Sequence, residues 1–269
     1  MTDLPRELCE LASRLAVAAG DLVFEGRKRG LGAISTKSSD TDVVTAFDRA
    51  SEHLIVEGVR ADRPDDAIVG EEGTDSAGAS GVRWLIDPID GTTNFQYDLP
   101  GYAVSIAALS QDRALAGAVY IPSSKELFTA TADGGAWLNG SSVSCGTLSS
   151  LQHALVATGF SYQIEKRREQ AMRIAGVIPR VRDIRRLGAA APDLCYVAAG
   201  RLDVFFEQGL GPWDWAAGEL IAREAGCRTG RFDGTPVGHS QVLACNPALF
   251  DQMVELLADT EPGRNPGIM

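Results

Sequence analysis

The sequence predicts a mixed α/β (α+β) fold with two β-sheets, and three observations lead to that prediction. An amphipathic helical pattern opens the chain, short apolar runs fill its middle, and strand-like runs alternate with helical ones in its second half. At 269 residues the chain is long enough to bury one large core. Because no internal repeat, low-complexity tract or proline-rich linker interrupts it, we expect one domain over residues 1–269. Its N-terminal part should end at about residue 150, and its C-terminal part should cover about 151–269.

Two helices are expected near the N-terminus. Apolar side chains recur at helical spacing at Leu8, Leu11, Leu15, Ala19 and Leu22. This pattern predicts a helix over about residues 5–25. A loop then leads to Lys37. Thr45 and Asp48 have the spacing of a capping box, which predicts a second helix that runs to about Arg60.

The middle of the chain is expected to be rich in strands. A short strand over 67–70 and an exposed loop over 74–81 come first. A buried strand over 82–86 then leads into the segment Asp87-Pro88-Ile89-Asp90-Gly91-Thr92-Thr93-Asn94-Phe95. Apolar runs separated by turns follow at 103–109, 114–121, 127–131 and 136–138, and they predict an antiparallel meander.

The second half of the chain alternates between strands and helices. The expected strands cover 154–157, 181–187, 203–206 and 241–245. The expected helices cover 165–177, 190–199, 213–225 and 247–258. Such alternation is typical of helices packed against a second sheet.

The composition excludes some classes of function. The formal net charge is −11, whereas surfaces that bind nucleic acids or anionic membranes are rich in Lys and Arg, so we expect neither partner. No apolar run reaches the roughly 18 residues of a membrane span, and residues 1–10 lack the pattern of a secretion signal, so we expect the protein in the cytoplasm. The cysteines at 9, 145, 195, 227 and 245 are odd in number and widely spaced, which favours reduced, mostly buried thiols.

The segment from Asp87 to Phe95 carries the clearest chemical signal. Asp87 and Asp90 follow a buried strand, and an acid at such a position costs free energy unless its charge is compensated. Mg²⁺ prefers oxygen ligands and would provide that compensation. Gly91 and Thr92 can open a helix, whose free amides can bind an anion. The segment therefore predicts a site for Mg²⁺ beside a phosphate.

Further acids stand at the ends of expected strands or the starts of expected helices: Asp48, Glu71 with Glu72, and Asp214. Each has a purely structural alternative, as the acid of a capping box, a solvated turn and a first-turn helix acid, respectively. Together with Asp87 and Asp90, however, these carboxylates would suit one or two Mg²⁺ ions. The histidines at 53, 153 and 239 lack the spacing of a zinc site.

Residues from about 37 to 225 resemble the inositol monophosphatase family of Mg²⁺-dependent, lithium-sensitive phosphatases. The resemblance rests on motifs in the order of the family: Lys37-x-x-x-x-Asp42-x-Val44-Thr45-x-x-Asp48, Gly70-Glu71-Glu72, Trp84-Leu85-Ile86-Asp87-Pro88-Ile89-Asp90-Gly91-Thr92-Thr93-Asn94-Phe95, and Trp213-Asp214-x-Ala216-Ala217-Gly218. The stretches Arg185–Ala190 and Val197–Asp203 are also similar to the family. Within it, the chain is most similar to bacterial inositol-1-monophosphatases of the actinobacterial type.

The resemblance implies a layered αβαβα sandwich of the inositol monophosphatase and fructose-1,6-bisphosphatase type, with two or three Mg²⁺ ions. The implied ligands are Glu71, Asp87 and the carbonyl of Ile89 for the first ion, and Asp87, Asp90 and Asp214 for the second. A third, weaker ion would lie by Glu71, and Lys37 would support the site from outside the ligands. The implied catalytic residues are Asp48, Glu71 and Thr92, of which Thr92 and Asp48 would orient and help to deprotonate the attacking water.

The resemblance also implies the residues that bind the substrate. They are Gly91 and Thr92 for the phosphate, and Asp90, Gly188, Ala189, Ala190, Glu207 and Asp214 for the alcohol. The family usually has Ser or Thr where this chain has Ala189, so one hydroxyl contact is lost.

These inferences favour an enzyme that hydrolyses myo-inositol 1-phosphate to inositol and phosphate. Its binding partner would then be a small-molecule phosphate ester. We also expect a homodimer. Related substrates remain open: fructose 1,6-bisphosphate, 3′-phosphoadenosine 5′-phosphate, histidinol phosphate or NADP. A nucleotide would need a basic lining, for which Arg185-Arg186 is the candidate, although a solvated strand end or a dimer contact also explains that pair. A different class is binding to the transcription machinery, as in some bacterial relatives.

Overall fold

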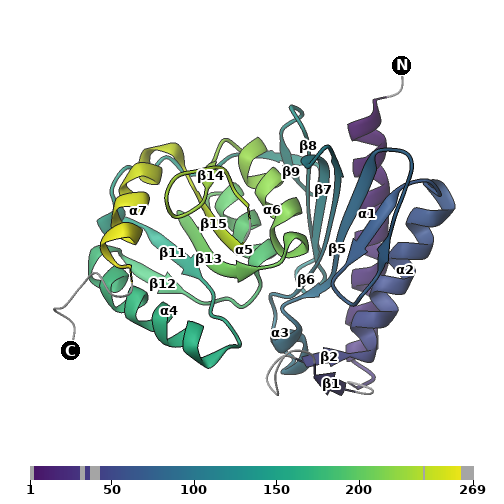
Figure 1. Cartoon of the computed structure of the whole chain (residues 1–269), viewed down its shortest axis with the longest axis horizontal. Coiled ribbons are helices and arrows are strands. Elements are labelled where there is room, and N and C mark those ends of the chain that lie inside the picture. The colour runs from purple at the N-terminus through teal and green to yellow at the C-terminus, as the bar shows by residue number, and fades with distance from the viewer. Residues whose placement is uncertain (1–2, 31–33, 37–42, 239, 262–269) are drawn as a thin grey trace.

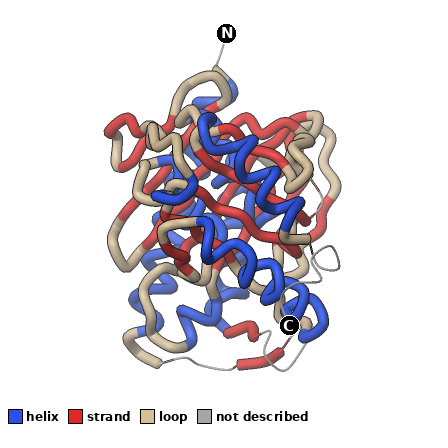
Figure 2. The backbone as a smooth tube through the Cα atoms, turned by 90° about the vertical axis from the view of Figure 1, so that its left-hand side faces the viewer, coloured by secondary structure: helices blue, strands red, loops and turns tan. Residues whose placement is uncertain are grey.

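The computed structural model describes residues 3–30, 34–36, 43–238 and 240–261. Five layers make up this part of the chain (Figure 1). Helices α1 and α2 cover one face of an eight-stranded sheet, and α5 and α6 lie between that sheet and a five-stranded one. Helices α4 and α7 cover the outer face of the smaller sheet, in front of its strands in the view from their side (Figure 2). The layered αβαβα fold is thereby confirmed.

The eight-stranded sheet has the order β10-β9-β8-β7-β6-β5-β3-β4. Its strands are β3 (Ala67–Gly70), β4 (Asp75–Ser76), β5 (Val82–Asp90), β6 (Ala103–Ser110), β7 (Arg113–Ile121), β8 (Glu126–Thr131), β9 (Ala136–Leu138) and β10 (Ser141–Val143). β3 and β5 pair in parallel, and the other neighbours pair antiparallel. The predicted meander is therefore present from β6 to β9 and continues into β10.

The five-stranded sheet has the order β12-β11-β13-β15-β14. Its strands are β11 (Leu155–Thr158), β12 (Asp183–Arg185), β13 (Val204–Leu210), β14 (Arg228–Gly230) and β15 (Ser240–Cys245). β11 runs parallel to β12 and β13, whereas β15 runs antiparallel to β13. A further pair, β1 (Ile34–Thr36) and β2 (Val43–Thr45), forms a small antiparallel sheet.

The helices lie close to their expected positions. They are α1 (Leu4–Arg27), α2 (Ala46–Asp62), α3 (Thr92–Gln96), α4 (Ile164–Val177), α5 (Ala190–Ala198), α6 (Pro212–Glu224) and α7 (Pro247–Asp259). Leu8, Leu11 and Leu15 form part of the buried face of α1, as the helical spacing predicted. Thr45 and Asp48 make the predicted capping box at the start of α2.

The core explains why the two halves of the chain pack together. One buried cluster contains Leu85 and Phe128 from the larger sheet, Leu194 and Leu220 from the helices between the sheets, and Phe205 from the smaller sheet. A second cluster lies between the larger sheet and α1 and α2, and a third between the smaller sheet and α4 and α7. Helices therefore cover both faces of the meander strands.

Three local predictions are corrected by the structure. The loop predicted over 74–81 contains the short strand β4, which pairs with β3. The short strands β1, β2, β10 and β14 were not predicted, because a three-residue run gives little periodicity to recognise. The strand predicted to end at Ile86 continues to Asp90, with a shift of register between Asp87 and Asp90.

No helix in the described ranges has both the length and the apolar composition needed to cross a membrane.

Candidate active site

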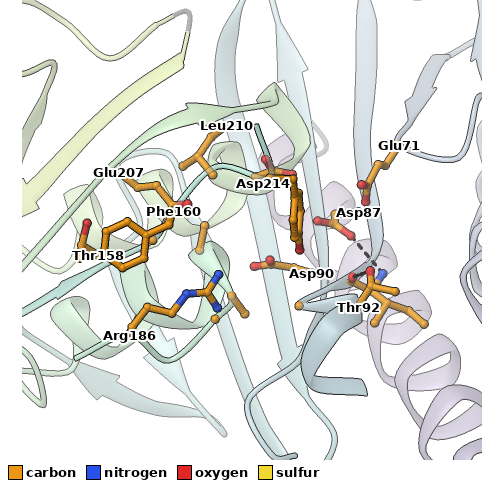
Figure 3. Close-up of a pocket in the computed structure, with 17 residues that line it drawn as sticks. Glu71, Asp87, Asp90, Thr92, Thr158, Phe160, Arg186, Glu207, Leu210 and Asp214 are labelled. Carbon is orange, nitrogen blue, oxygen red and sulfur yellow. Dashed lines mark hydrogen bonds between the residues drawn. The ribbon is translucent and has the colours of Figure 1, made fainter. Parts of the chain in front are cut away.

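A pocket of about 120 Å³ lies where the ends of parallel strands from the two sheets face each other (Figure 3). β3 and β5 of the larger sheet and β11, β12 and β13 of the smaller one direct residues at or after their C-terminal ends toward it. Ligands of α/β sheets commonly bind at such ends. The lining residues are Glu71, Asp87, Ile89, Asp90, Gly91, Thr92, Thr158, Gly159, Phe160, Tyr162, Arg186, Gly188, Ala189, Ala190, Glu207, Leu210 and Asp214.

The irregular end of β5 places two acids in this pocket. Asp87 pairs in register with Ser105 of β6, but the register then shifts before Asp90 pairs with Ala103. Such a bulge re-aims side chains, and both Asp87 and Asp90 line the pocket. The amide of Ile89 donates to Asp87 Oδ1 over 3.0 Å, which fixes the turn between the two acids. The carboxylates thus belong to an irregular strand instead of following its end.

Glu71 is held in place by a buried acid that the sequence analysis did not select. Glu52 of α2 is 5% exposed and accepts hydrogen bonds from the amides of Glu72 and Thr74 over 2.8 and 3.1 Å. The Thr74 hydroxyl also donates to Glu52 over 2.6 Å. A Cβ at Gly70 would collide with the Glu52 carboxylate, so glycine is needed there. Glu52 therefore fixes the turn that directs Glu71 into the pocket.

Gly91 and Thr92 connect the pocket to the buried Asp48. Gly91 has a φ of +89°, and a Cβ there would lie 3.0 Å from Ala189 Cβ. The Thr92 hydroxyl lies 3.2 Å from Asp48 Oδ1 and 3.1 Å from the carbonyl oxygen of Ile89. Asp48 Oδ2 accepts from the amide and the hydroxyl of Thr45 over 2.7 and 2.5 Å. Asp48 therefore serves both as the acid of a capping box and as the partner of Thr92.

Asp214 and Asp90 reach the pocket through contacts with helix starts. Asp214 lies in the first turn of α6 and accepts a hydrogen bond from the amide of Gly211 over 2.7 Å. Asp90 Oδ2 accepts from the amide of Ala191 over 2.6 Å. Ala189, at the start of α5, has no side-chain cap, so Asp90 satisfies an amide of that helix from another element.

The site concentrates negative charge away from water. Asp87 is 2% exposed and Asp90 is 9% exposed. Burial raises the pKa of Asp87 well above its usual range, and the charges of Glu71, Asp90 and Asp214 raise it further. Burial raises the pKa of Asp90 to about 7, although hydrogen bonds from Ala191 and Ala190 oppose the shift. Burial, Asp90 and Glu71 also raise the pKa of Asp214. A cation bound among these groups would oppose every one of these shifts.

The donor set fits a hard divalent cation. Within the described ranges, no three acidic, histidine or cysteine side chains converge closely enough to form a ready-made cluster around one ion. Four carboxylates nevertheless line one pocket with Ile89 between two of them. Oxygen donors are those that Mg²⁺ prefers, and Mg²⁺ also keeps several waters, so it does not need a closed cage of side chains. The predicted ligands Glu71, Asp87, Ile89, Asp90 and Asp214 are therefore brought together.

Opposite these acids, Glu207 of β13 lies at the other end of the pocket (Figure 3). Burial raises its pKa to about 7, while the charge of Arg186 lowers it and that of Asp214 raises it. Gly188, Ala189 and Ala190 line the same pocket as Glu207 and Gly91, and their predicted contact with the alcohol stays a prediction. Ala189 is 5% exposed, and its methyl side chain offers no hydroxyl group to a ligand.

Five lining residues were not predicted: Thr158, Gly159, Phe160, Tyr162 and Leu210. Arg186 had been considered only as part of a basic lining for a nucleotide, together with Arg185, and Arg186 alone of that pair lines the pocket. A signal that could have found such residues is their position at the C-terminal ends of parallel strands. Thr158 is the last residue of β11, and Arg186 directly follows β12, which runs parallel to β11. The sequence alone did not show that these strands are parallel and face β5. Lys37 lies outside the described residues, so its predicted place remains a prediction.

Comparison with known proteins agrees with the family resemblance of the sequence motifs. A model described as the inositol monophosphatase family matches residues 4–261. The chain is 40% identical to inositol-1-monophosphatase SuhB of Mycobacterium tuberculosis (strain H37Rv) and covers 94% of it, with 94% of this chain aligned. It is 39% identical to the Escherichia coli K12 protein named Nus factor SuhB, over 94% of this chain and 96% of that one. The structure of an inositol monophosphatase from Anabaena (Nostoc) sp. PCC 7120 superposes with a TM-score of 0.86 at 30% identity, over 97% of this chain and 99% of that one.

Proposed function

This chain belongs to the inositol monophosphatase family, and from that premise we propose that it is a Mg²⁺-dependent phosphomonoesterase that hydrolyses myo-inositol 1-phosphate to myo-inositol and phosphate. The observation that carries the proposal is the pocket itself. Four carboxylates, the Gly91–Thr92 turn and Glu207 line one cavity, although they come from both halves of the chain. A metal-assisted hydrolase of small phosphate esters needs these three parts together.

The residues of the pocket would have two roles in hydrolysis, which are to bind the metal ions and to activate the attacking water. Glu71, Asp87, Asp90, Asp214 and the Ile89 carbonyl would hold two or three Mg²⁺ ions. Ions bound there would lower the pKa of a water molecule and offset negative charge on the reacting phosphate. The Thr92 hydroxyl would accept a hydrogen bond from the attacking water and pass the proton toward Asp48, with which it is already in contact.

The remaining atoms balance without a covalent intermediate. Water would attack phosphorus and lose a proton toward Asp48, and the bond from phosphorus to the ester oxygen would break. The leaving alkoxide would take a proton from a second water molecule, and the hydroxide formed would take up the proton held at Asp48. The amides of Gly91 and Thr92 would orient the phosphate oxygens, and the positive φ of Gly91, which glycine adopts without strain, sets the direction of that turn. Asp90, Asp214, Glu207 and the amides along 188–190 would bind the ring hydroxyls.

Further properties follow from the same family membership. We propose lithium sensitivity, a homodimer and a cytoplasmic location, each supported by the resemblance to the bacterial phosphatases. We also propose that residues 1–269 act as one domain, since a single buried cluster contains residues of both sheets.

A second candidate is a role in binding the transcription machinery. It is favoured by one observation, the 39% identity to an E. coli protein named Nus factor SuhB. Substitution of a pocket carboxylate would distinguish the two functions, because hydrolysis needs these carboxylates and a binding role does not.

The proposal predicts a definite order among phosphate esters. With Mg²⁺, the purified protein should release phosphate from myo-inositol 1-phosphate with a higher kcat/KM than from fructose 1,6-bisphosphate, 3′-phosphoadenosine 5′-phosphate, histidinol phosphate or NADP. Removal of the metal with EDTA should abolish the release, and Mg²⁺ should restore it. A colorimetric phosphate assay, run with and without Li⁺, measures all of these rates.

Two outcomes of this panel would count against the proposal. A higher kcat/KM for a nucleotide or fructose ester would refute the choice of inositol phosphate. Release of phosphate from none of the esters would refute the enzyme assignment and favour the binding role.

A further inference from the structure

Two consecutive arginines at the end of β12 face different surroundings. Arg185 is exposed and donates to Asp183 Oδ2 over 2.6 Å and to the carbonyl of Ile184 over 2.9 Å. Arg186 is also exposed, but its guanidinium points into the candidate active-site pocket (Figure 3). Among the described residues that line this pocket, Arg186 is the only one with a positive side chain. A solvated strand end therefore describes Arg185, whereas Arg186 belongs to the site.

Glycines make room for Arg186 and for Glu207 in the same pocket. Gly188 has a φ of +102°, and a Cβ there would collide with Nη1 of Arg186 and lie 2.9 Å from Asn94 Oδ1. Gly159 follows β11, and a Cβ there would collide with both carboxylate oxygens of Glu207. A side chain at either position would compete with one of the two charged groups for space. The two glycines therefore leave room for Arg186 and Glu207 in the same pocket.

The charges around Arg186 indicate which kind of alcohol fits. Its charge lowers the pKa values of Glu207 and Asp193, both of which burial raises. Asp193 is 1% exposed, and its Oδ1 has no hydrogen-bond partner among the described residues. In the described part of the pocket lining, Arg186 is accompanied by the Glu207 carboxyl group and by no second basic side chain, so this lining lacks the cluster of cations that a second anionic group on the substrate would favour. Hydroxyl groups fit better, because a guanidinium donates to them and a carboxylate accepts from them.

We propose that Arg186 is a specificity-determining residue that, together with Glu207, binds two hydroxyls of a neutral polyol beside the ester being cleaved. The site then prefers phosphate esters of uncharged polyols over esters whose alcohol lacks hydroxyls or carries a second phosphate. This proposal rests on the proposed function, because it concerns the alcohol half of the same reaction. It adds a residue from the mouth of the pocket to the expected contacts along 188–190 and at Glu207.

The test compares Arg186→Gln and Arg186→Lys with the matched control Arg185→Gln. Steady-state kinetics with Mg²⁺ would use myo-inositol 1-phosphate, fructose 1,6-bisphosphate and p-nitrophenyl phosphate, whose aromatic alcohol has no further hydroxyl. Arg186→Gln should raise KM for the inositol ester about 10-fold, the usual scale for a lost charged hydrogen bond, with a smaller change in kcat. The ratio of kcat/KM for the inositol ester to that for p-nitrophenyl phosphate should fall by a similar factor. Arg186→Lys should recover part of the loss, and Arg185→Gln should behave as wild type.

A double substitution checks that the two residues act as a pair. In Arg186→Gln combined with Glu207→Gln, the loss for the inositol ester should be smaller than the product of the separate losses. Because Arg186 is exposed, its substitution should leave the melting temperature close to that of wild type.

Three results would overturn the inference. They are an unchanged KM for the inositol ester in Arg186→Gln, an equal loss for the inositol and p-nitrophenyl esters, or a loss confined to fructose 1,6-bisphosphate. The last result would show that Arg186 binds a second phosphate. The wild-type enzyme distinguishes this failure from failure of the proposed function. If wild type hydrolyses the inositol ester and Arg186→Gln does so equally well, only the role of Arg186 is refuted.

Discussion

Replacing Asp90 by asparagine should lower kcat for myo-inositol 1-phosphate by on the order of 10³-fold, the scale for losing one preorganised charge contact to a transition state. Asp90 is 9% exposed and lines the pocket beside Gly91. Burial raises its pKa, and the nearby charges of Glu207 and Glu71 raise it further. Asparagine keeps the size and one carbonyl oxygen, which can still accept the 2.6 Å hydrogen bond from Ala191. What it loses is the negative charge that a divalent cation requires.

Two measurements separate this chemical effect from a folding defect. Without metal, Asp90→Asn should melt no lower than wild type, because the change removes one of several like charges in a buried site. Added Mg²⁺ should raise the melting temperature of wild type more than that of the variant. Asp112→Asn, an exposed acid paired with Arg83, is the matched control and should keep wild-type kcat. Wild-type kcat in Asp90→Asn would show that phosphatase chemistry does not depend on this carboxylate.

Replacing Thr92 by valine should lower kcat by roughly 10²–10³-fold, the range expected for loss of a proton-transfer contact. Valine keeps the branched shape but cannot connect an attacking water to Asp48, from which the Thr92 hydroxyl is 3.2 Å away. KM should change little, because the lost contact acts on the water and not on the alcohol. Steady-state kinetics at saturating Mg²⁺ would measure both constants.

Thr129→Val is the matched control for the loss of a threonine hydroxyl. Thr129 lies on β8 and does not line the pocket. The Thr129→Val variant should therefore have the kcat of the wild-type enzyme. A large rise in KM with unchanged kcat in Thr92→Val would contradict the proposed role and indicate instead a contact with the substrate phosphate.

The acidic motifs could be predicted from sequence because each has a local signature. Thr45 and Asp48 form a capping box, and Asp87 and Asp90 come directly after a buried apolar run, in the last part of β5. The structure brings Asp87 and Asp90 to one pocket together with Glu71, Asp214 and Glu207, whereas Asp48 lies outside the pocket lining and contacts it through Thr92. Family membership was also predicted correctly, because the motifs stand in the order of the family, and the layered fold was predicted correctly as a consequence of that resemblance. The long periodic segments by themselves predicted a mixed α/β fold with two sheets.

Other parts of the site depend on tertiary structure and left no local signature. Glu52 is one acid within an amphipathic helix, and its hydrogen bonds to the turn after β3 come from packing of α2 against that turn. Arg186 is adjacent to Arg185 in sequence, and the sequence does not show which of the two side chains enters the pocket. That depends on the direction of β12 and on the space that Gly188 leaves for the Arg186 guanidinium. The irregular end of β5 likewise depends on its pairing with β6, which no pattern within residues 82–90 reveals.

Crystals grown with Mn²⁺ would show where the carboxylates hold metal, because Mn²⁺ accepts the same oxygen ligands as Mg²⁺ and scatters anomalously. The predicted result is at least two anomalous peaks in the pocket. One should lie against the Glu71 and Asp87 carboxylates with the Ile89 carbonyl, and the other against Asp87, Asp90 and Asp214. The second peak should weaken or vanish in Asp90→Asn. A map with no peak among these side chains, from crystals of protein that hydrolyses the inositol ester with Mn²⁺, would contradict the assignment of this pocket as the metal-dependent active site.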